Sequence, residues 1–174
     1  MTKRGSAWSN AWKILAGVFV VLVVYFLASP QRRTDQAPKN APEFSFPDLD
    51  GKPTALSSYR GKVVFLDFWA TWCEPCLEEL PDLMRLHAAH EKQGFTVVGV
   101  AMDAEGASVV RPFARQNKMN YPILISEGEL PKGYPVPGFP TAFLIDREGK
   151  IVHRYIGPQG YDELERDLAE ILPR

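Results

Sequence analysis

The sequence contains few thiols, few histidines and almost no net charge. Its 174 residues include two cysteines and three histidines, and its formal net charge at pH 7 is −1. Two cysteines exclude a scaffold that is held together by several disulfides. Residues 44–174 carry 14 Lys and Arg against 19 Asp and Glu, an excess of five acids. Because nucleic acids bind to basic surfaces, we expect no nucleic-acid partner.

Long apolar runs are also rare, and Ile14–Ala28 is the exception, with Lys and Arg residues on both sides. Its length lies between the core of a signal peptide and the ~20 residues of a full membrane span. We expect residues 14–31 to be a transmembrane anchor, with a signal peptide as the alternative, after a cytoplasmic segment at 1–13. A basic start before a short apolar core is the form of an export signal, which places the rest of the chain outside the cytoplasm. Residues 32–43 are polar and rich in proline, as expected for a linker.

The remaining part, residues 44–174, alternates between strand-like and helix-like patterns. Asp50 and Gly51 form a turn signal between two alternating segments, and VVFLDFW at 63–69 is an apolar run of strand length. The expected elements that follow are a helix from Cys76 to Gly94, a strand at 95–101, a helix at 107–117, a strand at 123–124, a hairpin of strands 141–145 and 151–155, and a helix at 161–172. This order predicts one α/β domain with a central mixed β-sheet flanked by helices.

Both cysteines lie in the segment WATWCEPCLEELP, residues 69–81, where the strand pattern changes to a helical one. At a helix N-terminus, unpaired N–H groups and the helix dipole stabilise the thiolate of Cys73, the form that attacks disulfides. Cys76 lies one turn further on the same face, where it can attack the resulting mixed disulfide. Pro75 suits the first helical turn, where no backbone donor is needed. The segment therefore predicts a redox-active pair of cysteines.

Other uses of the cysteine pair fit the sequence less well. A zinc site would take His87 and His90 as further ligands, but a helix that holds both Cys76 and His87 separates them by ~16 Å at 1.5 Å per residue. Covalent haem attachment needs a histidine where Leu77 stands. A purely structural disulfide would close too short a loop to contribute much stability. We therefore expect no metal at this site.

Two motifs resemble one family. DFWATWCEPC resembles the active-site segment of thioredoxin-fold proteins, and GKPTALSSYRGKVVFLDFWATWCEPCLEELP is similar to the TlpA/ResA-like branch of that fold. GFPTAFLIDREGKIVHRYIG resembles the second signature of the fold, and the similarity spans residues 42–173. It implies a thioredoxin-like fold with an N-terminal hairpin and an insertion at residues 103–125. It also implies a membrane-anchored thiol-disulfide oxidoreductase of the bacterial inner (cytoplasmic) membrane, with its domain on the periplasmic or extracytoplasmic side.

The resemblance also implies a substrate-binding set. Pro140 falls where thioredoxin folds hold a cis proline against the dithiol, and Phe139 would offer backbone groups that pair with a substrate peptide. Trp72, Glu74 and Pro75, in and beside the dithiol loop, complete this set. The acidic side chain of Glu74 opposes the nearby thiolate and favours the disulfide, which makes the pair a better reductant.

Two acids are further candidates for catalysis. Asp67 interrupts an apolar run, and a buried carboxyl there suggests proton exchange with Cys76. The alternative is an Asp that is hydrogen-bonded at a strand edge. Thioredoxins carry an acid at this position, whereas many TlpA/ResA-like proteins carry Asn. Glu79 lies one helical turn after Cys76, where ResA-like proteins have a functional acid.

Neighbouring side chains have less specific interpretations. Trp69 and Trp72 suit either core packing or an apolar rim around the thiols, and the sequence leaves both open. Glu78, Asp82 and Glu91 have the spacing of a solvated helix face.

Together these features predict a membrane-anchored protein-disulfide reductase that needs no cofactor. By resemblance, its substrates would be disulfide-containing proteins, such as apocytochrome c in cytochrome c maturation or oxidase assembly factors in copper-site assembly. Its electrons would come from a membrane thiol carrier of the DsbD/CcdA type. One alternative is a thiol oxidase or isomerase of the same fold, which the reduction potential separates. Another is a copper-binding assembly chaperone that uses the two thiols; the sequence offers no evident third ligand and leaves His153 open for that place.

Overall fold

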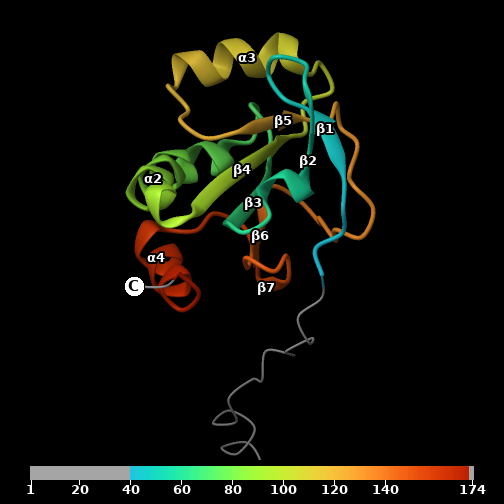
Figure 1. Ribbon diagram of the computed structural model, residues 1–174. Helices are drawn as coiled ribbons and strands as arrows, with labels where there is room; N and C mark the ends of the chain where they lie inside the picture. Colours follow the sequence, from blue (N-terminus) through green and yellow to red (C-terminus); the bar gives the residue numbers. More distant parts are fainter. Residues whose placement is uncertain (1–39, 173–174) are drawn as a thin grey trace, which may run out of the picture. The chain divides into compact units, whose positions relative to one another are not determined.

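The computed structural model describes residues 40–172, which are drawn in colour in Figure 1. The predicted anchor at 14–31, the predicted cytoplasmic segment at 1–13 and the predicted linker as far as residue 39 lie outside the described residues. Within residues 40–172, no helix is both long enough and apolar enough to cross a membrane.

A five-stranded sheet in the order β5-β4-β3-β6-β7 forms the centre of the domain. Its strands are β3 (Val63–Trp69), β4 (Phe95–Ala101), β5 (Ile123–Ile125), β6 (Thr141–Ile145) and β7 (Ile151–Ile156). β4 runs parallel to β3 and β5, whereas β6 is antiparallel to β3 and β7. Every residue of β3 and β4 is buried, which explains why their sequences are nearly all apolar rather than alternating. The predicted mixed sheet is confirmed.

Three helices pack against one face of this sheet, and α2 lies beside α4 (Figure 1). They are α2 (Glu74–His90), α3 (Ala107–Gln116) and α4 (Tyr161–Ala169). Phe65 and Trp69 of β3 belong to the buried cluster that these helices complete. Because side chains alternate along a strand, Asp67 faces the same side as these two residues. The one acid of the central strand is therefore directed toward the helices.

The opposite face is covered by the N-terminal hairpin, by a short 3-10 helix and by the loop before β6. The hairpin consists of β1 (Ser45–Pro47) and β2 (Pro53–Ala55), and the 3-10 helix is η1 (Leu56–Tyr59). Phe44, Leu56 and Tyr134 pack there with the remaining side chains of β3. The predicted hairpin is confirmed. Gly51 in its turn has a φ of 83°, which glycine adopts without strain.

The predicted and observed elements differ mainly at the ends of the helices. α2 passes into the 3-10 turn η2 (Glu91–Gln93) and stops at Gly94, whose φ of 86° suits the predicted C-terminal glycine. α4 ends at Ala169, whereas the apolar pattern continues to Leu172. Leu172 still packs in the core, so the periodicity extends beyond the last helical residue.

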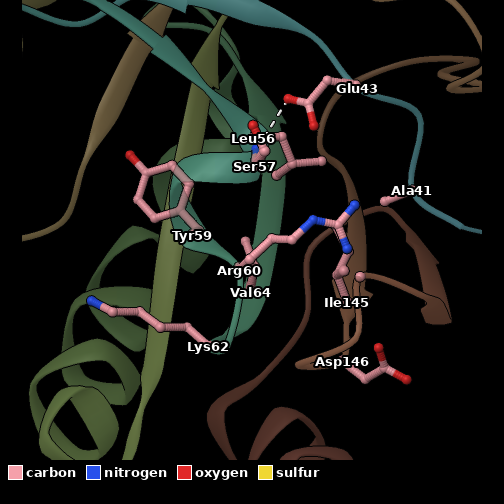
Figure 2. Close-up of a pocket in the computed structure, with 11 residues that line it drawn as sticks. Ala41, Glu43, Leu56, Ser57, Tyr59, Arg60, Lys62, Val64, Ile145 and Asp146 are labelled. Atoms are coloured by element: carbon pink, nitrogen blue, oxygen red, sulfur yellow. Dashed lines mark hydrogen bonds between the residues drawn. The ribbon is translucent and has the colours of Figure 1, made fainter.

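Residues 40–43, which the sequence pattern assigns to the linker, pair with the domain. The Ala41 N–H donates to the Gly149 carbonyl at 2.8 Å, in the β6–β7 turn at the end of the sheet opposite the cysteines. The Glu43 carboxylate accepts the Ser57 N–H at 3.0 Å, the dashed line beside a surface hollow in Figure 2. The folded domain therefore begins near residue 40.

Candidate active site

The cysteines lie where β3 passes into α2. The chain turns after Trp69, and α2 begins at Glu74 with Cys73 as its N-cap residue. Cys73 and Cys76 form a disulfide whose Cα atoms are 5.3 Å apart. Their exposed fractions are 5% and 4%. The structure therefore presents the oxidised state of the predicted pair.

The first turn of α2 directs a backbone donor at the Cys73 sulfur. The Cys76 N–H donates to Cys73 Sγ at 3.3 Å, and the Leu77 N–H donates to the Cys73 carbonyl at 3.2 Å. Pro75 occupies the first turn, as predicted. After reduction, the Cys76 N–H and the helix dipole stabilise a thiolate at Cys73 more than at Cys76, which lies one turn inside the helix. The geometry thus favours Cys73 as the nucleophile.

Asp103 holds the loop that leads to Cys73. It lies two residues after the end of β4, is 1% exposed and accepts hydrogen bonds from both the hydroxyl and the main-chain N–H of Thr71. The N–H lies 3.2 and 3.1 Å from the two carboxylate oxygens. Sequence analysis did not identify Asp103. The sequence feature that could have indicated it is an acid just after a buried strand. The carboxyl ends of the parallel strands β3 and β4 lie at the same edge of the sheet, so such an acid lies near the loop that follows β3.

A cis peptide bond joins Phe139 to Pro140, as the resemblance implies. Pro140 is buried, and its carbonyl accepts the Gly157 N–H at 2.9 Å. The Phe139 ring lies edge-on to Trp72, with 5.9 Å between the ring centroids. The structure therefore brings two of the predicted substrate-binding side chains into contact beside the disulfide.

The two tryptophans that the sequence leaves ambiguous have different environments. Trp69 is 3% exposed and packs against Phe113 of α3, with 5.5 Å between the ring centroids. Trp72 is 66% exposed. Core packing therefore describes Trp69, whereas Trp72 forms an apolar rim beside the thiols. Glu74 and Pro75 are also exposed next to Trp72.

Asp67 is 2% exposed in the central strand β3. Its register partners are Gly99 on β4 and Ala142 on β6, so the alternative of an Asp that is hydrogen-bonded at a strand edge is wrong. Its Oδ1 atom has no hydrogen-bond partner. Burial, and then the charge of Glu79, raise the pKa of Asp67 well above its ordinary value. Both effects favour the protonated carboxyl.

Glu79 is 4% exposed on the face of α2 that packs on the sheet. Its Oε2 accepts the main-chain N–H of Gln159 at 2.9 Å, whereas Oε1 has no partner. Its pKa is raised to about 7, chiefly by burial; the hydrogen bond from Gln159 lowers it and the charge of Asp82 raises it. Both protonation states are therefore populated near neutral pH, as a group that exchanges protons requires.

Two residues that sequence analysis did not identify complete the surroundings of the acids. A Cβ at Gly99 would lie 2.8 Å from Trp69 Nε1 and 3.3 Å from Tyr121 Cε2, so a glycine is needed to admit these rings. Tyr121 is 7% exposed, and its pKa is raised by burial and then by the charges of Asp67 and Glu79. No local pattern marks Tyr121, because only the return of the chain into β5 brings it to this site.

Asp82 departs from the predicted solvated helix face. It is half-buried, and its Oδ2 accepts the Tyr161 N–H at the start of α4 at 3.1 Å. The reason is that α4 packs beside α2, and the spacing of residues within α2 does not indicate this neighbour. Glu78 and Glu91 are exposed, as predicted.

The histidines of α2 have structural contacts. His87 is 4% exposed, and its Nδ1 accepts the Val97 N–H at 3.3 Å. His90 Nε2 lies 2.8 Å from a carboxylate oxygen of Glu165. Within residues 40–172, no three His, Cys, Asp or Glu side chains are placed to hold a metal ion together.

Known proteins share this arrangement of sequence and structure. Residues 37–154 match the AhpC/TSA family. The thiol-disulfide oxidoreductase ResA of Bacillus thuringiensis subsp. konkukian (strain 97-27) is 39% identical over 137 residues, which are 78% of either chain. A thiol:disulfide interchange protein of the thioredoxin family from Chlorobium tepidum TLS superposes with a TM-score of 0.67 at 31% identity, over 80% of this chain and 100% of that one. StoA from Bacillus subtilis gives a TM-score of 0.61 at 31% identity, over 72% and 95% of the two chains. The chain therefore belongs to the AhpC/TSA family and, within it, to the ResA-like thiol-disulfide oxidoreductases with a thioredoxin-like fold.

Proposed function

We propose that the chain reduces disulfide bonds of partner proteins through Cys73 and Cys76. The Cys73 thiolate attacks one sulfur of the partner disulfide, forms a mixed disulfide and releases one partner cysteine as a thiolate. Cys76 then attacks the Cys73 sulfur, which frees the second partner cysteine and closes the internal disulfide. Two electrons pass to the partner, and its two thiolates take up two protons. The product form of the protein is the oxidised form described above.

The position of Cys73 at the N-cap of α2 is the observation that carries this proposal. The Cys76 N–H, which donates to Cys73 Sγ, and the helix dipole stabilise its thiolate. The exposed acid Glu74 directly follows it in the chain and opposes the thiolate. This charge favours the disulfide over the dithiol and so supports donation of electrons rather than their removal.

We assign proton exchange to Asp67 and Glu79. Cys76 must lose its proton before it attacks Cys73, and Glu79 lies one helical turn away with a pKa of about 7. A carboxylate in this range can accept the thiol proton and later return it to a leaving thiolate. Asp67 and Glu79 interact electrostatically, so the proton can reside on either acid.

We assign substrate docking to the rim around the disulfide. Phe139 would offer backbone groups to an extended substrate segment, next to Pro140, whose own carbonyl is bonded to Gly157. Trp72, which is largely exposed, would cover apolar side chains of that segment. Glu74 and Pro75 are exposed between the two cysteines and would lie against the same segment.

The proposed setting is the extracytoplasmic side of a bacterial inner membrane, with residues 14–31 as the anchor. The resemblance to TlpA/ResA-like proteins supports this setting and an electron donor of the DsbD/CcdA type. It also supports apocytochrome c or oxidase assembly factors as substrates. No cofactor is part of this mechanism, since the electrons pass between sulfur atoms.

The reduction potential of residues 38–174 tests the direction of electron flow. This fragment is a compact unit that keeps the pairing of Ala41 with Gly149. Equilibration in a defined thiol buffer should give a potential near or below about −270 mV, the value of thioredoxin. A potential near about −120 mV, typical of a strong thiol oxidant, would contradict the proposal and indicate a disulfide donor.

A further inference from the structure

The loop between β7 and α4 contacts two separate parts of the site. At its start, the Gly157 N–H donates to the carbonyl of Pro140 at 2.9 Å. Two residues later, the Gln159 N–H donates to Glu79 Oε2 at 2.9 Å. The Gln159 side chain also donates within the loop, through Nε2 to the Gly157 carbonyl at 2.9 Å. One short loop therefore connects the cis-proline segment to the buried acid of α2.

A second main-chain donor reinforces this connection. The Tyr161 N–H donates to Asp82 Oδ2 at 3.1 Å. Glu79 and Asp82 lie one turn apart on α2. Two main-chain N–H groups, one in the loop and one at the first residue of α4, therefore join this segment to carboxylates of α2. The Arg85 guanidinium of α2 also lies over the Tyr161 ring, 3.8 Å from its centroid.

The groups that face Glu79 explain why this loop matters. Asp67 from β3 and Asp82 from α2 are acids, and Tyr121, from the segment before β5, is a buried phenol. Negative charge on either acid disfavours ionisation of Glu79. The Gln159 N–H acts in the opposite sense, because a hydrogen bond to a carboxylate stabilises its charge.

We propose that Gln159 is a positioning residue of the exchange reaction, whose main-chain N–H holds the Glu79 carboxylate beside Cys76 while the same loop is tied to Pro140. The proposal rests on the proposed function, since it assumes that Glu79 exchanges protons with the cysteine pair. The identity of the side chain at 159 is secondary, and the backbone donor performs the task.

The test compares two substitutions at one position in the oxidised full chain. Q159P removes the N–H, whereas Q159A keeps it and serves as the matched control. The titration midpoint of Glu79 is read from the carboxyl resonance in ¹³C-glutamate NMR, assigned with E79Q. We expect Q159P to raise the midpoint by about one pH unit and Q159A to leave it where the native protein has it.

A backbone ester at position 159, which replaces the N–H by oxygen and keeps the glutamine side chain, covers the case in which Q159P does not fold, and it should raise the midpoint in the same way. A further variant, D82N, checks the assay with the opposite sign. D82N keeps an oxygen acceptor for the Tyr161 N–H but removes the charge that opposes ionisation of Glu79. We expect it to lower the midpoint by about half a pH unit. Equal midpoints in Q159A and in the variants that lack the N–H at position 159 would overturn the proposal.

The pH profile of thiol-disulfide exchange separates this inference from the proposed function. If the reduced chain reacts with a protein disulfide and E79Q abolishes the step near pH 7, the proposed role of Glu79 holds. The pH at the midpoint of this step should then be higher in Q159P and lower in D82N than in the native protein. An unchanged midpoint in Q159P would overturn the role of Gln159 alone. If E79Q leaves the profile unchanged, the proposed role of Glu79 fails, and with it the role of Gln159 in the reaction.

Discussion

Asp67 of β3 and Glu79 of α2 share one buried environment, and the charge of Glu79 raises the pKa of Asp67. The two residues are 2% and 4% exposed, and each has one carboxyl oxygen without a hydrogen-bond partner. Two close carboxylates oppose each other's ionisation, so the pair retains a proton more readily than an isolated acid. The domain therefore has a protonatable pair close to Cys76, which determines several of its expected properties.

The stability of the oxidised protein should decrease as the pH rises from about 4.5 to about 7. Folded Glu79 keeps its proton up to a pH of about 7, whereas its ordinary pKa is 4.5. The folded state thus binds more protons than the unfolded state in this window, and the free energy of unfolding falls with pH. The shift corresponds to about 3 kcal/mol. Urea unfolding without reductant, at several pH values, measures this slope.

E79Q provides the control for the pH dependence of stability. The amide does not titrate, so the slope between pH 4.5 and 7 should become shallower by the contribution of Glu79. Asp67 acts in the same direction, whereas His87, whose pKa is lowered chiefly by burial, acts in the opposite one, so both contribute to the slope that remains. A slope in E79Q equal to that of the native protein would exclude Glu79 as the source.

D67N and E79Q should each slow reduction of a protein disulfide at pH 7 by about 10- to 100-fold, because each removes a proton acceptor from a shared pair. The double substitution should slow the reaction little more than either single one, since the two acids act on the same proton. Stopped-flow tryptophan fluorescence follows the reaction. E78Q, which removes an exposed acid of the same helix, is the matched control and should react at the native rate.

W69A and W72A should affect different properties. W69A removes a side chain that is 3% exposed and should lower the free energy of unfolding by about 3–5 kcal/mol. W72A removes a side chain that is 66% exposed and should change this free energy by less than about 0.5 kcal/mol. It should slow reaction with a protein disulfide more than reaction with a small cyclic disulfide. Equal slowing with both substrates would argue against a docking role for Trp72.

D103A should destabilise the domain by about 1–3 kcal/mol, because the Thr71 N–H and hydroxyl lose their buried acceptor. It should also slow exchange, since Thr71 belongs to the loop that places Cys73. Chemical unfolding and exchange kinetics measure the two effects. E105A removes a nearby exposed acid and should change neither quantity, whereas native behaviour of D103A would show that the loop does not depend on this contact.

Local sequence signals predicted most of the fold. The apolar runs of β3 and β4, the turn at Asp50–Gly51 and the glycine at the end of α2 each depend on neighbouring residues, and each is confirmed. The prediction of the redox pair had the same basis, since a helix N-terminus and its first-turn proline are local features. Helix ends were predicted less accurately, because apolar side chains such as Leu172 continue to pack after the helical hydrogen bonds stop.

The surroundings of the site depended on contacts between distant segments. Gln159 donates to Glu79 across 80 positions of sequence, and Asp103 holds Thr71 across 32 positions. Asp82 has the spacing of a solvated face, yet it accepts the first N–H of α4. No periodicity or motif around these residues indicates such partners.

The sequence by itself determined the chemistry of the protein, because thiolate stabilisation at Cys73 requires only a helix that begins there and a second cysteine one turn later. The tertiary structure decided which acids can take part. Asp67 and Glu79 acquire raised pKa values through desolvation by segments that lie far away in sequence, and Glu79 accepts a hydrogen bond from one of them. Proton affinity depends on burial and on nearby charge, and both are properties of the packed fold rather than of the local sequence.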